Sequence, residues 1–440
     1  MTTDSEHPPR EANPPSPAGS DDASTTPGSE NTKAVGYGAV FAVREFRAMF
    51  AAHVLSILGT VFATVALAAL VFQRTGSALL TALVFALTNL PYALSGLLLS
   101  GIADSHPARR VLVTCDVLSA VCVAGMVVPG APIAVLLVLR TVASMISPLF
   151  TGTRSASLAD VLEGDRFILG RSLIRIVSQT SQIVGFGLGG LVLVWMSPRS
   201  ALGVTVFTFA GSALLLRFGT RDRPARHTGN GALMRDSIAS AGRLLADPRI
   251  RALLLMWWVP PMFFTLAEGV AAPFVKDAAA GSLGFGLFLA AMPAGTVLSE
   301  MLAGTLLGPD ARDRIALPLA AVSLLPLVGF AFHPPLPVGV VLLFLTGLCA
   351  AYALGMDRWF VTEVPDEMRG RAMTLLGAGL MTLQGVGMTA GGVVAEWAPP
   401  YAVLGGGGLL GTLSVLAVLK SVRRSRMPVV LPTAAPGGMA

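Results

Sequence analysis

The sequence has 440 residues, of which 53% are hydrophobic and only 13% are charged, and its mean hydropathy is +0.71. Soluble domains carry about 25% charged residues, so this balance excludes an ordinary soluble protein and indicates a membrane protein. The net charge of +6 comes largely from basic loops between apolar segments, and we expect no nucleic-acid partner. The three cysteines, Cys115, Cys122 and Cys349, lie inside apolar runs, which favours packing roles over a disulfide or zinc site, and we expect no cofactor or metal.

The chain begins with a polar segment. Residues 1–43 are rich in Pro, Ser, Asp and Glu and contain few aliphatic side chains, so we expect a disordered cytoplasmic tail that cannot bury enough surface to fold. This segment has no basic stretch followed by an apolar stretch, so we do not expect a signal peptide here. The first span itself would then direct insertion into the membrane. Residues 423–440 form a second short cytoplasmic tail, also rich in Pro and Gly.

Apolar runs of about 20 residues, the length that crosses a bilayer, recur between the tails. The longest polar interruption follows the sixth run, so the predicted fold is an all-α polytopic membrane protein with two six-helix halves, 44–219 and 250–422, joined by a cytoplasmic loop at 220–249. The twelve expected spans lie near 48–72, 78–103, 110–129, 131–152, 167–195, 200–219, 250–275, 282–307, 314–332, 336–360, 369–396 and 401–420.

The basic residues predict the orientation. Placing both termini and every even-numbered connection in the cytoplasm puts most of the 31 Lys and Arg inside, and leaves only Arg74, Arg199 and Lys276 on the outer side. We therefore expect a multi-pass protein of a bacterial plasma membrane with both termini inside. The basic loops would face the anionic lipid of the inner leaflet.

The fifth span contains VGFGLGG, which resembles a dinucleotide-binding turn. That motif requires a preceding strand and an acidic residue about 20 residues later, and neither is expected here. The pattern Q-x-x-G-x-x-x-G-G instead occurs twice, at Gln182–Gly190 and Gln384–Gly392. Small residues four apart allow spanning helices to approach closely, so we expect related halves, no nucleotide, and helix packing at Gly185, Gly189, Gly190, Gly387, Gly391 and Gly392.

Three motifs resemble the major facilitator superfamily. SGIADSHPARRVLV, from Ser100 to Val113, is similar to its loop between spans two and three, and the span-five glycines resemble the G-P-x-x-G-G element of its drug:proton antiporter branch. VPDEMRGRAM before span eleven resembles the macrolide-efflux-like group. The resemblance covers about residues 44–422 and implies a transporter with twelve transmembrane helices.

The chain departs from these motifs at five positions. Ser100 and Ser105 replace a glycine and an arginine of the loop, and Phe186 stands where the antiporter element has proline. In span one, Thr60 replaces an aspartate and Thr64 a basic residue that are common in similar exporters. These two threonines argue against proton coupling through span one.

The cytoplasmic loop motif supplies the first gate candidates. Asp104 would accept backbone N–H groups at the start of span eleven, and Arg109 and Arg110 would hold anionic lipid or a neighbouring carboxylate. The alternative is that all three merely mark the inside loop.

Ionisable residues inside spans are costly and are therefore candidates for function. Arg140 is nine residues beyond Ala131, roughly 14 Å deep at about 1.5 Å per residue, and it matches the span-four arginine that the resemblance implicates in a proton relay. Glu268, in the outer half of span seven, is the second proton-coupling candidate, because burial would favour its protonated form. The alternative for Arg140 is pairing with a buried carboxylate or with backbone carbonyls purely for stability, and the alternative for Glu268 is a hydrogen-bonded border position.

Span seven also carries Pro260 and Pro261 within MWWVPPMFF. Both prolines remove backbone hydrogen bonds, so we expect a helix kink there. A kinked, aromatic-rich helix would flank a substrate cavity, although its rings are equally suited to lipid or core contacts.

Arg175 in span five and Glu300 in span eight complete the gate candidates. Each is seven or eight residues from the cytoplasmic end of its span, roughly 10 to 12 Å deep, so a salt bridge between halves is expected. The alternative is that each pairs within its own half, for example Arg175 with Asp116.

The expected function is export of a hydrophobic or amphipathic small molecule by alternating access, with proton antiport. A nutrient importer of the same fold is the alternative, although few polar groups are expected at the midplane. A membrane enzyme is a third class, but the sequence lacks H-E-x-x-H and G-x-S-x-G motifs and its five histidines are scattered.

Overall fold

The computed structural model describes residues 37–163, 165–223, 241–365 and 368–425, and over these ranges it contains helices and turns but no β-strand. The helices of the first half are α1 (Tyr37–Phe41), α2 (Arg44–Thr75), α3 (Ala78–Ser105), α4 (Ala108–Val127), α5 (Ile133–Val161), α6 (Asp165–Trp195) and α7 (Pro198–Gly219). Those of the second half are α9 (Pro248–Phe264), α10 (Leu266–Asp277), α11 (Gly281–Leu306), α12 (Pro309–Val322), α13 (Leu325–Val328), η1 (Gly329–Phe332), α14 (Leu336–Leu348), η2 (Cys349–Ala351), α15 (Tyr352–Glu363), α16 (Arg369–Val394) and α17 (Pro400–Ser425).

Ten helical segments within the described ranges are long and apolar enough to cross a membrane. They include α9 with α10, α12 with α13 and η1, and α14 with η2 and α15, each taken as one segment. The two remaining expected spans correspond to α3, which is a shorter apolar helix over Ala78–Tyr92, and α16, whose centre is rich in glycine and also contains threonines and Gln384. The protein is therefore a multi-pass, all-helical membrane protein.

Several helices begin or end away from the positions predicted from the sequence. The largest difference is α5, which continues to Val161 instead of ending near residue 152. The extra turns place Arg154 on a helix packed inside the first half, where it is only 8% exposed. Small and hydroxyl side chains follow Phe150, so the apolar run in the sequence stops there, but the helix continues.

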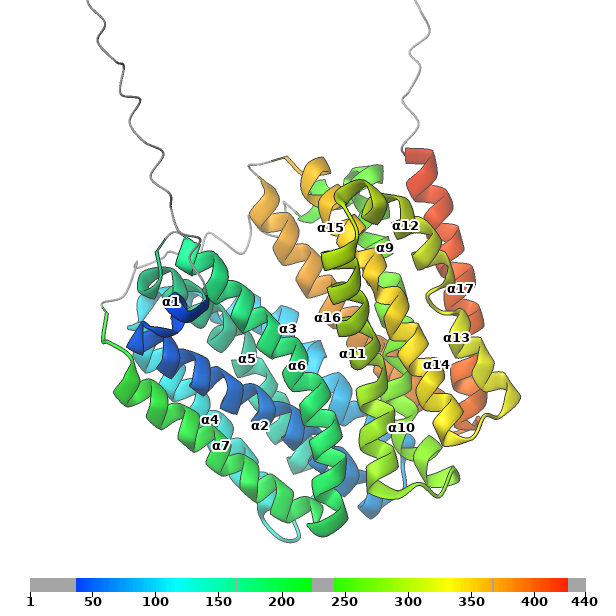
Figure 1. The fold of residues 1–440 in the computed structure, drawn as a ribbon. Coiled ribbons are helices and arrows are strands. Elements are labelled where there is room, and N and C mark those ends of the chain that lie inside the picture. The colour runs from blue at the N-terminus through cyan, green and yellow to red at the C-terminus, as the bar shows by residue number, and fades with distance from the viewer. Residues whose placement is uncertain (1–36, 164, 224–240, 366–367, 426–440) are drawn as a thin grey trace, which may run out of the picture. The chain divides into compact units, whose positions relative to one another are not determined.

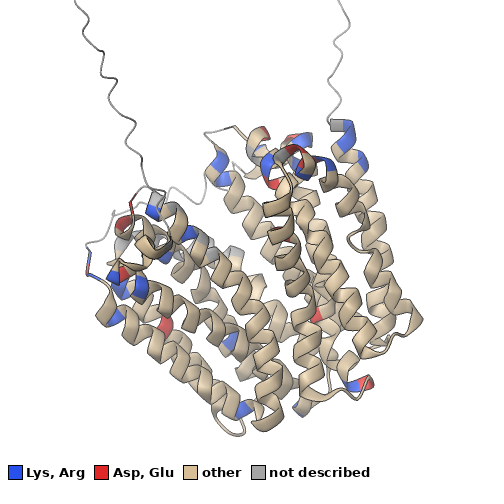
Figure 2. Ribbon diagram, viewed as in Figure 1, with Lys and Arg blue, Asp and Glu red and all other residues tan. Residues whose placement is uncertain are grey.

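Basic side chains gather at one end of the helices. Figure 2 shows most of the blue residues near α1, α12 and α15. We call this the basic end; it contains Arg109, Arg249 and Arg358, all in ion pairs. The opposite end, which we call the far end, contains the α2–α3 turn at Gly76 and the residues after α16, including Glu396.

The two halves contact each other along two helix–helix interfaces, which we call seams. Within the first half α2 packs against α6 and α7, and within the second half α16 and α17 pack against α9. Between the halves α6 packs against α11, and α3 packs against α16 and α10. Figure 1 shows the first half in blue to green and the second half in light green to red.

The last glycine of each Q-x-x-G-x-x-x-G-G copy lies at one of these seams. A Cβ atom built on Gly190 would lie 2.5 Å from the Cα of Gly286 in α11, and one built on Gly392 would lie 2.3 Å from the Cβ of Ala82 in α3. Only glycine permits these separations, because real Cβ contacts are longer. The two copies therefore occupy equivalent places, each against a helix of the opposite half.

The earlier glycines of each copy face the adjacent helix of their own half. Gly185 and Gly189 lie against Val61 and Val65 of α2. In α16, a Cβ on Gly387 would lie 1.9 Å from the carbonyl oxygen of Met262, and one on Gly391 would lie 3.0 Å from that of Leu266. The stretch that resembles a nucleotide-binding turn is thus the interior of α6, a continuous helix without a preceding strand.

Candidate functional site

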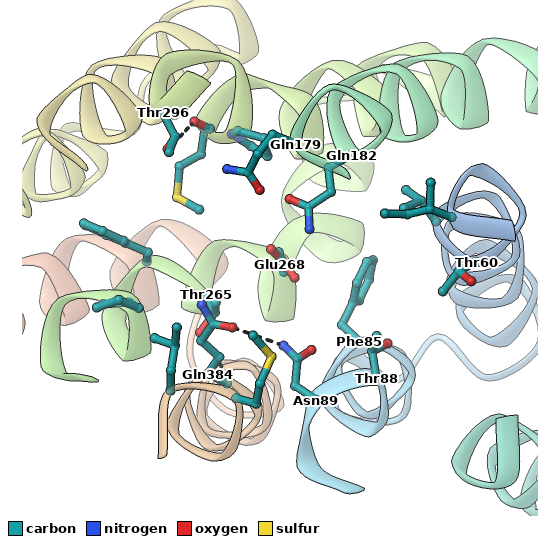
Figure 3. A pocket seen from close by; sticks show the side chains of 18 of the residues that line it. Thr60, Phe85, Thr88, Asn89, Gln179, Gln182, Thr265, Glu268, Thr296 and Gln384 are labelled. Atoms are coloured by element: carbon teal, nitrogen blue, oxygen red, sulfur yellow. Dashed lines mark hydrogen bonds between the residues drawn. The ribbon is translucent and has the colours of Figure 1, made fainter. Parts of the chain in front are cut away.

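A cavity of ≈ 530 Å³ lies between the halves and is lined by both. Aromatic rings line part of it, and amide and hydroxyl side chains line the rest (Figure 3). Its charged or titratable members are His53 and Arg154 from the first half and Glu268, Glu300 and Tyr352 from the second. The polar lining further includes Ser56, Thr60, Thr64, Thr88, Asn89, Ser147, Thr151, Gln179, Gln182, Thr265, Thr296 and Gln384.

Glu268 points into this cavity from the first turn of α10. Figure 3 shows it between Gln182 of α6 and Gln384 of α16. No residue in the described part of the chain gives its carboxyl group a hydrogen bond or an ion pair. A carboxyl group in a spanning helix without a partner is costly as a carboxylate, so this position is suited to binding and releasing a proton or a cation.

The break between α9 and α10 positions Glu268. Pro260 and Pro261 lie within α9, which ends four residues later, and the hydroxyl of Thr265 donates to the carbonyl oxygen of Gln384 in α16 at 3.0 Å. Of the aromatic residues that precede the break, Trp257 lines the cavity and Trp258 does not. Trp258 donates its indole N–H to the carbonyl oxygen of Leu376 at 3.0 Å.

The two glutamines that begin the repeated motif both line the cavity. Gln384 also lies 3.5 Å from the amide nitrogen of Asn89 in α3. The motif therefore has a division of roles, in which Gln182 and Gln384 face the cavity while their glycines face neighbouring helices. The sequence identified the repeat but not the orientation of its glutamines, which depends on how α6 and α16 are rotated against their neighbours.

Arg140 is buried in the first half, away from the cavity lining, with 4% of its surface exposed. Its guanidinium donates to the hydroxyl of Thr64 in α2 at 2.8 Å and to that of Thr88 in α3. The partners are thus hydroxyl groups rather than the carboxylate or backbone carbonyls considered from the sequence. Thr64 is one of the two span-one threonines at which this chain departs from similar exporters.

A small polar chamber of ≈ 60 Å³ connects Arg140 with Asp116. It is large enough for about two water molecules at ~30 Å³ each. The hydroxyl of Ser144 and the Nε of Arg140 are buried there without a hydrogen-bond partner among the described residues, and water would satisfy both groups.

The basic end contains the other gate candidates. Arg109 donates to Asp222 at 2.8 Å, so it contacts a neighbouring carboxylate, whereas Arg110 is exposed. Glu300 lines the cavity. The side chains of Asp104 and Arg175 lie outside the described residues, so their expected contacts stay predictions.

The first half also contains a buried cluster that the sequence did not identify. His53 of α2 contacts Arg154 of α5, and Asp116 of α4 accepts hydrogen bonds from Ser56 at 3.0 Å and Ser212 at 2.5 Å. From the sequence, His53 was an isolated histidine and Arg154 belonged to a cytoplasmic connection. Their contact depends on the packing of α2 against α5, for which no pattern in the sequence gives a signal.

Comparisons with known proteins agree with the fold. The model of the Major Facilitator Superfamily matches residues 49–268, which is half of the chain. The "Multidrug efflux pump Tap" of Mycolicibacterium fortuitum is 26% identical over 348 residues, covering 76% of this chain and 85% of that protein. Tap of Mycobacterium tuberculosis is 26% identical over 324 residues, covering 70% and 76%.

Solved structures share the fold at low sequence identity. A POT family transporter in complex with 5-aminolevulinic acid has a TM-score of 0.67 and 11% identity, covering 87% of this chain and 97% of that one. The nucleoside transporter NupG has a TM-score of 0.68 and 16% identity, covering 87% and 100%. With its multi-pass helical halves and its match to the family model, this protein is a transporter rather than an enzyme, and it belongs to the Major Facilitator Superfamily.

Proposed function

We propose that this protein is a secondary exporter of hydrophobic or amphipathic small molecules that works by alternating access. The observation that carries the proposal is the cavity between the halves, which combines aromatic rings, amides and the carboxyl group of Glu268; no described residue pairs with that carboxyl group. Such a lining suits a substrate with apolar bulk and a few polar groups. The efflux-pump names of relatives that match at least 70% of this chain support the direction of transport.

The proposed topology has twelve spans and places the basic end in the cytoplasm of a bacterial cell. The asymmetry of Lys and Arg between the two ends supports this orientation. The six-helix halves would be residues 44–219 and 250–422, the cytoplasmic loop 220–249, and the cytoplasmic tails 1–43 and 423–440. The arginines of the basic end would contact anionic inner-leaflet lipid.

Export would be driven by protons, with Glu268 and Arg140 as the coupling residues. Glu268 faces the cavity without a partner, so it can exchange a proton with either side as the cavity alternates. Arg140 connects α5 with α2 and α3 through Thr64 and Thr88. Movement of this guanidinium would change how those three helices pack.

The gate would lie at the basic end. Asp104, Arg109 and Arg110 would hold the loop after α3, and Arg175 with Glu300 would bridge the halves when the inner side is shut. In this structure Arg109 pairs with Asp222, which lies at the start of the loop 220–249. That contact supports a role for Arg109 in fixing the inner surface of the first half.

Inside-out membrane vesicles containing the full chain provide the test, with ethidium as the transported probe. An acidic lumen should drive ethidium into the vesicles, and collapse of the pH gradient with an ionophore should stop it. Vesicles without the protein are the control. Absence of gradient-driven accumulation for ethidium and for a panel of other amphipathic drugs would reject the proposal.

A gene deletion in the native host separates export from import. Intracellular retention of a toxic compound after deletion supports export, whereas loss of growth on a single nutrient supports the importer alternative.

A further inference from the structure

The buried cluster of the first half joins four helices through polar contacts. His53 of α2, Asp116 of α4 and Arg154 of α5 are 3%, 1% and 8% exposed, and Ser178 of α6 lies 3.0 Å from the Nε2 of His53. His53 and Arg154 also line the central cavity. The cluster therefore connects the cavity with the interior of the first half.

The contacts determine the charge of His53. The Nη1 of Arg154 faces the Nδ1 of His53, and a guanidinium can only donate hydrogen bonds. Nδ1 must therefore carry a lone pair. The remaining ring proton is on Nε2, which donates to Ser178, while the hydroxyl of Ser178 donates to the carbonyl oxygen of Ile174 at 2.9 Å. His53 is thus neutral in this conformation.

Asp116 supplies the negative charge of the cluster. Its two oxygens accept hydrogen bonds from Ser56 and Ser212, and Arg154 is close enough to interact with it electrostatically. With Asp116 as a carboxylate, one arginine, one aspartate and a neutral histidine give a net charge of zero. A proton added to Nδ1 would make the cluster positive, break the hydrogen bond from Arg154 and place two cations in contact inside the protein.

We propose that His53, Arg154 and Asp116 form a proton-binding site of the first half. The proton reaches the Nδ1 of His53 from the cavity, and Arg154 leaves the histidine for the carboxylate of Asp116. This inference rests on the proposed function and extends it. It gives α2 a titratable group on the same helix face as Thr60, about two turns away; Thr60 is the residue that replaces the aspartate of similar exporters.

The direction of the response follows from linkage. The present conformation has closed contacts between the halves at the far end, at Gly190–Gly286 and Gly392–Ala82, and it requires neutral His53. Protons therefore bind more tightly to a conformation in which Arg154 has left His53. In this proposal that conformation is one in which the far-end contacts are open, so acid shifts the population towards it.

The other titratable groups near the cluster are few. In the described part of the chain, Tyr92 of α3 interacts with Arg154, and Cys115 precedes Asp116 on α4. Glu268, Glu300 and Tyr352 line the same cavity from the second half. These residues, together with Asp116 of the site itself, are the competing sources of a pH response that the experiment must separate from His53.

Spin labels at the far end measure the response without any substrate. Ser200 and Asp277 are exposed at the ends of α7 and α10, one in each half, and both would be changed to Cys after the native cysteines are replaced by Ala. Electron–electron double resonance on the full chain in nanodiscs then gives the fraction with a long inter-label distance between pH 5 and 8. We expect the ratio of long to short distances to rise on acidification, by at most about tenfold per pH unit for one proton.

Three variants test the assignment. His53→Asn keeps an acceptor for Arg154 but cannot titrate, so it should flatten the response. Arg154→Gln removes the opposing cation and should move the midpoint to higher pH, a change that a purely structural role does not predict. His333→Asn is the matched control, because His333 has φ 53°, which asparagine tolerates, and it should leave the response unchanged.

A wild-type response in His53→Asn, or an unchanged midpoint in Arg154→Gln, would overturn the proposal. Loss of the response in Glu268→Gln with retention in His53→Asn would assign it to the second half and would also overturn it. The ethidium assay tests export separately, so a pH response without transport would reject the proposed function and leave the proton site intact.

Discussion

At the scale of single residues, Glu268 and Arg140 illustrate two ways in which a spanning helix accommodates a charge. Arg140 is surrounded by hydroxyl groups from two helices, whereas Glu268 faces the cavity with no described partner. The two hydroxyl partners hold the Arg140 guanidinium against α2 and α3, whereas a desolvated carboxyl group favours its protonated form. Their environments therefore suit Arg140 to positioning and Glu268 to proton exchange.

Replacement of Glu268 by Gln tests this distinction. Glutamine resembles the protonated carboxyl group permanently, so transport should lose its pH dependence while ethidium binding falls less than about threefold, roughly 0.7 kcal/mol. Rates of gradient-driven ethidium accumulation across pH 6 to 8 measure this. Asp277→Asn, an exposed change on the same helix, is the control; a wild-type pH profile in Glu268→Gln would show that coupling lies elsewhere.

At the scale of helices, α6 contains a glycine that helix packing requires and a glycine that a larger residue could replace. A Cβ on Gly190 would meet the backbone of α11, whereas a Cβ on Gly187, three residues earlier, has nothing within 4 Å. The same helix thus has one face that requires glycine and another that does not.

Gly190→Ala and Gly187→Ala form a matched pair. Gly190→Ala must separate α6 from α11, at a cost of about 1 to 3 kcal/mol for overpacking, and should reduce transport at least tenfold with normal membrane insertion. Gly187→Ala should be neutral. The larger substitutions Gly189→Leu and Gly391→Leu should abolish transport. Nucleotide binding should be undetectable in every variant. Equal transport by the Gly190 and Gly187 variants would contradict the packing role.

At the scale of the whole molecule, Glu396 connects the two halves at the far end. Its carboxylate accepts hydrogen bonds from the hydroxyl of Ser77 at 2.6 Å and from the backbone N–H of Leu79 at 2.8 Å, both at the start of α3. These bonds hold the pKa of Glu396 below its ordinary value. A lowered pKa means that the contact is complete above the ordinary carboxyl pKa, about 4.3, and is lost only as the pH falls through the lowered value.

Glu396→Gln should weaken this contact, because a charged acceptor forms stronger hydrogen bonds than a neutral amide. The fraction of molecules open at the far end should then rise at every pH between 5 and 8, without a change in the shape of the pH response. The spin-label pair at residues 200 and 277 measures both quantities. Ser77→Ala should also raise the open fraction. If the far end stays closed in both variants, the hydrogen bonds of Glu396 do not hold the halves together there.

The proposed gate at the basic end would control opening of the cavity on the side opposite to the far end. If Arg175 and Glu300 bridge the halves when the inner side is shut, Glu300→Gln should raise the labelling of a cysteine introduced in the cavity from the cytoplasm. The exchange of Arg175→Glu with Glu300→Arg should partly restore it. An exchange that restores nothing would indicate pairing within each half, and an outward-open structure with the two side chains more than about 6 Å apart would exclude the bridge.

The sequence by itself determined the properties that depend on short stretches of chain. The apolar runs predicted a multi-pass helical protein, the loop motif and repeated glycines indicated the superfamily, and the basic loops separated the two ends of the helices. The helix breaks of the second half are only partly predictable from the sequence. Pro260 and Pro261 predict a kink, but α9 ends at Phe264, and the hydroxyl of the next residue, Thr265, donates to α16.

Only the tertiary structure decided which polar groups meet. His53 and Arg154 are separated by 101 residues, and Ser56 and Asp116 by 60, so no local pattern relates them. Gln182 and Gln384 begin a repeated motif whose spacing predicts helix packing, yet both side chains line the cavity. Hydropathy fixes which segments enter the membrane, because that depends on composition, whereas the rotation and neighbours of each helix depend on packing against all the others.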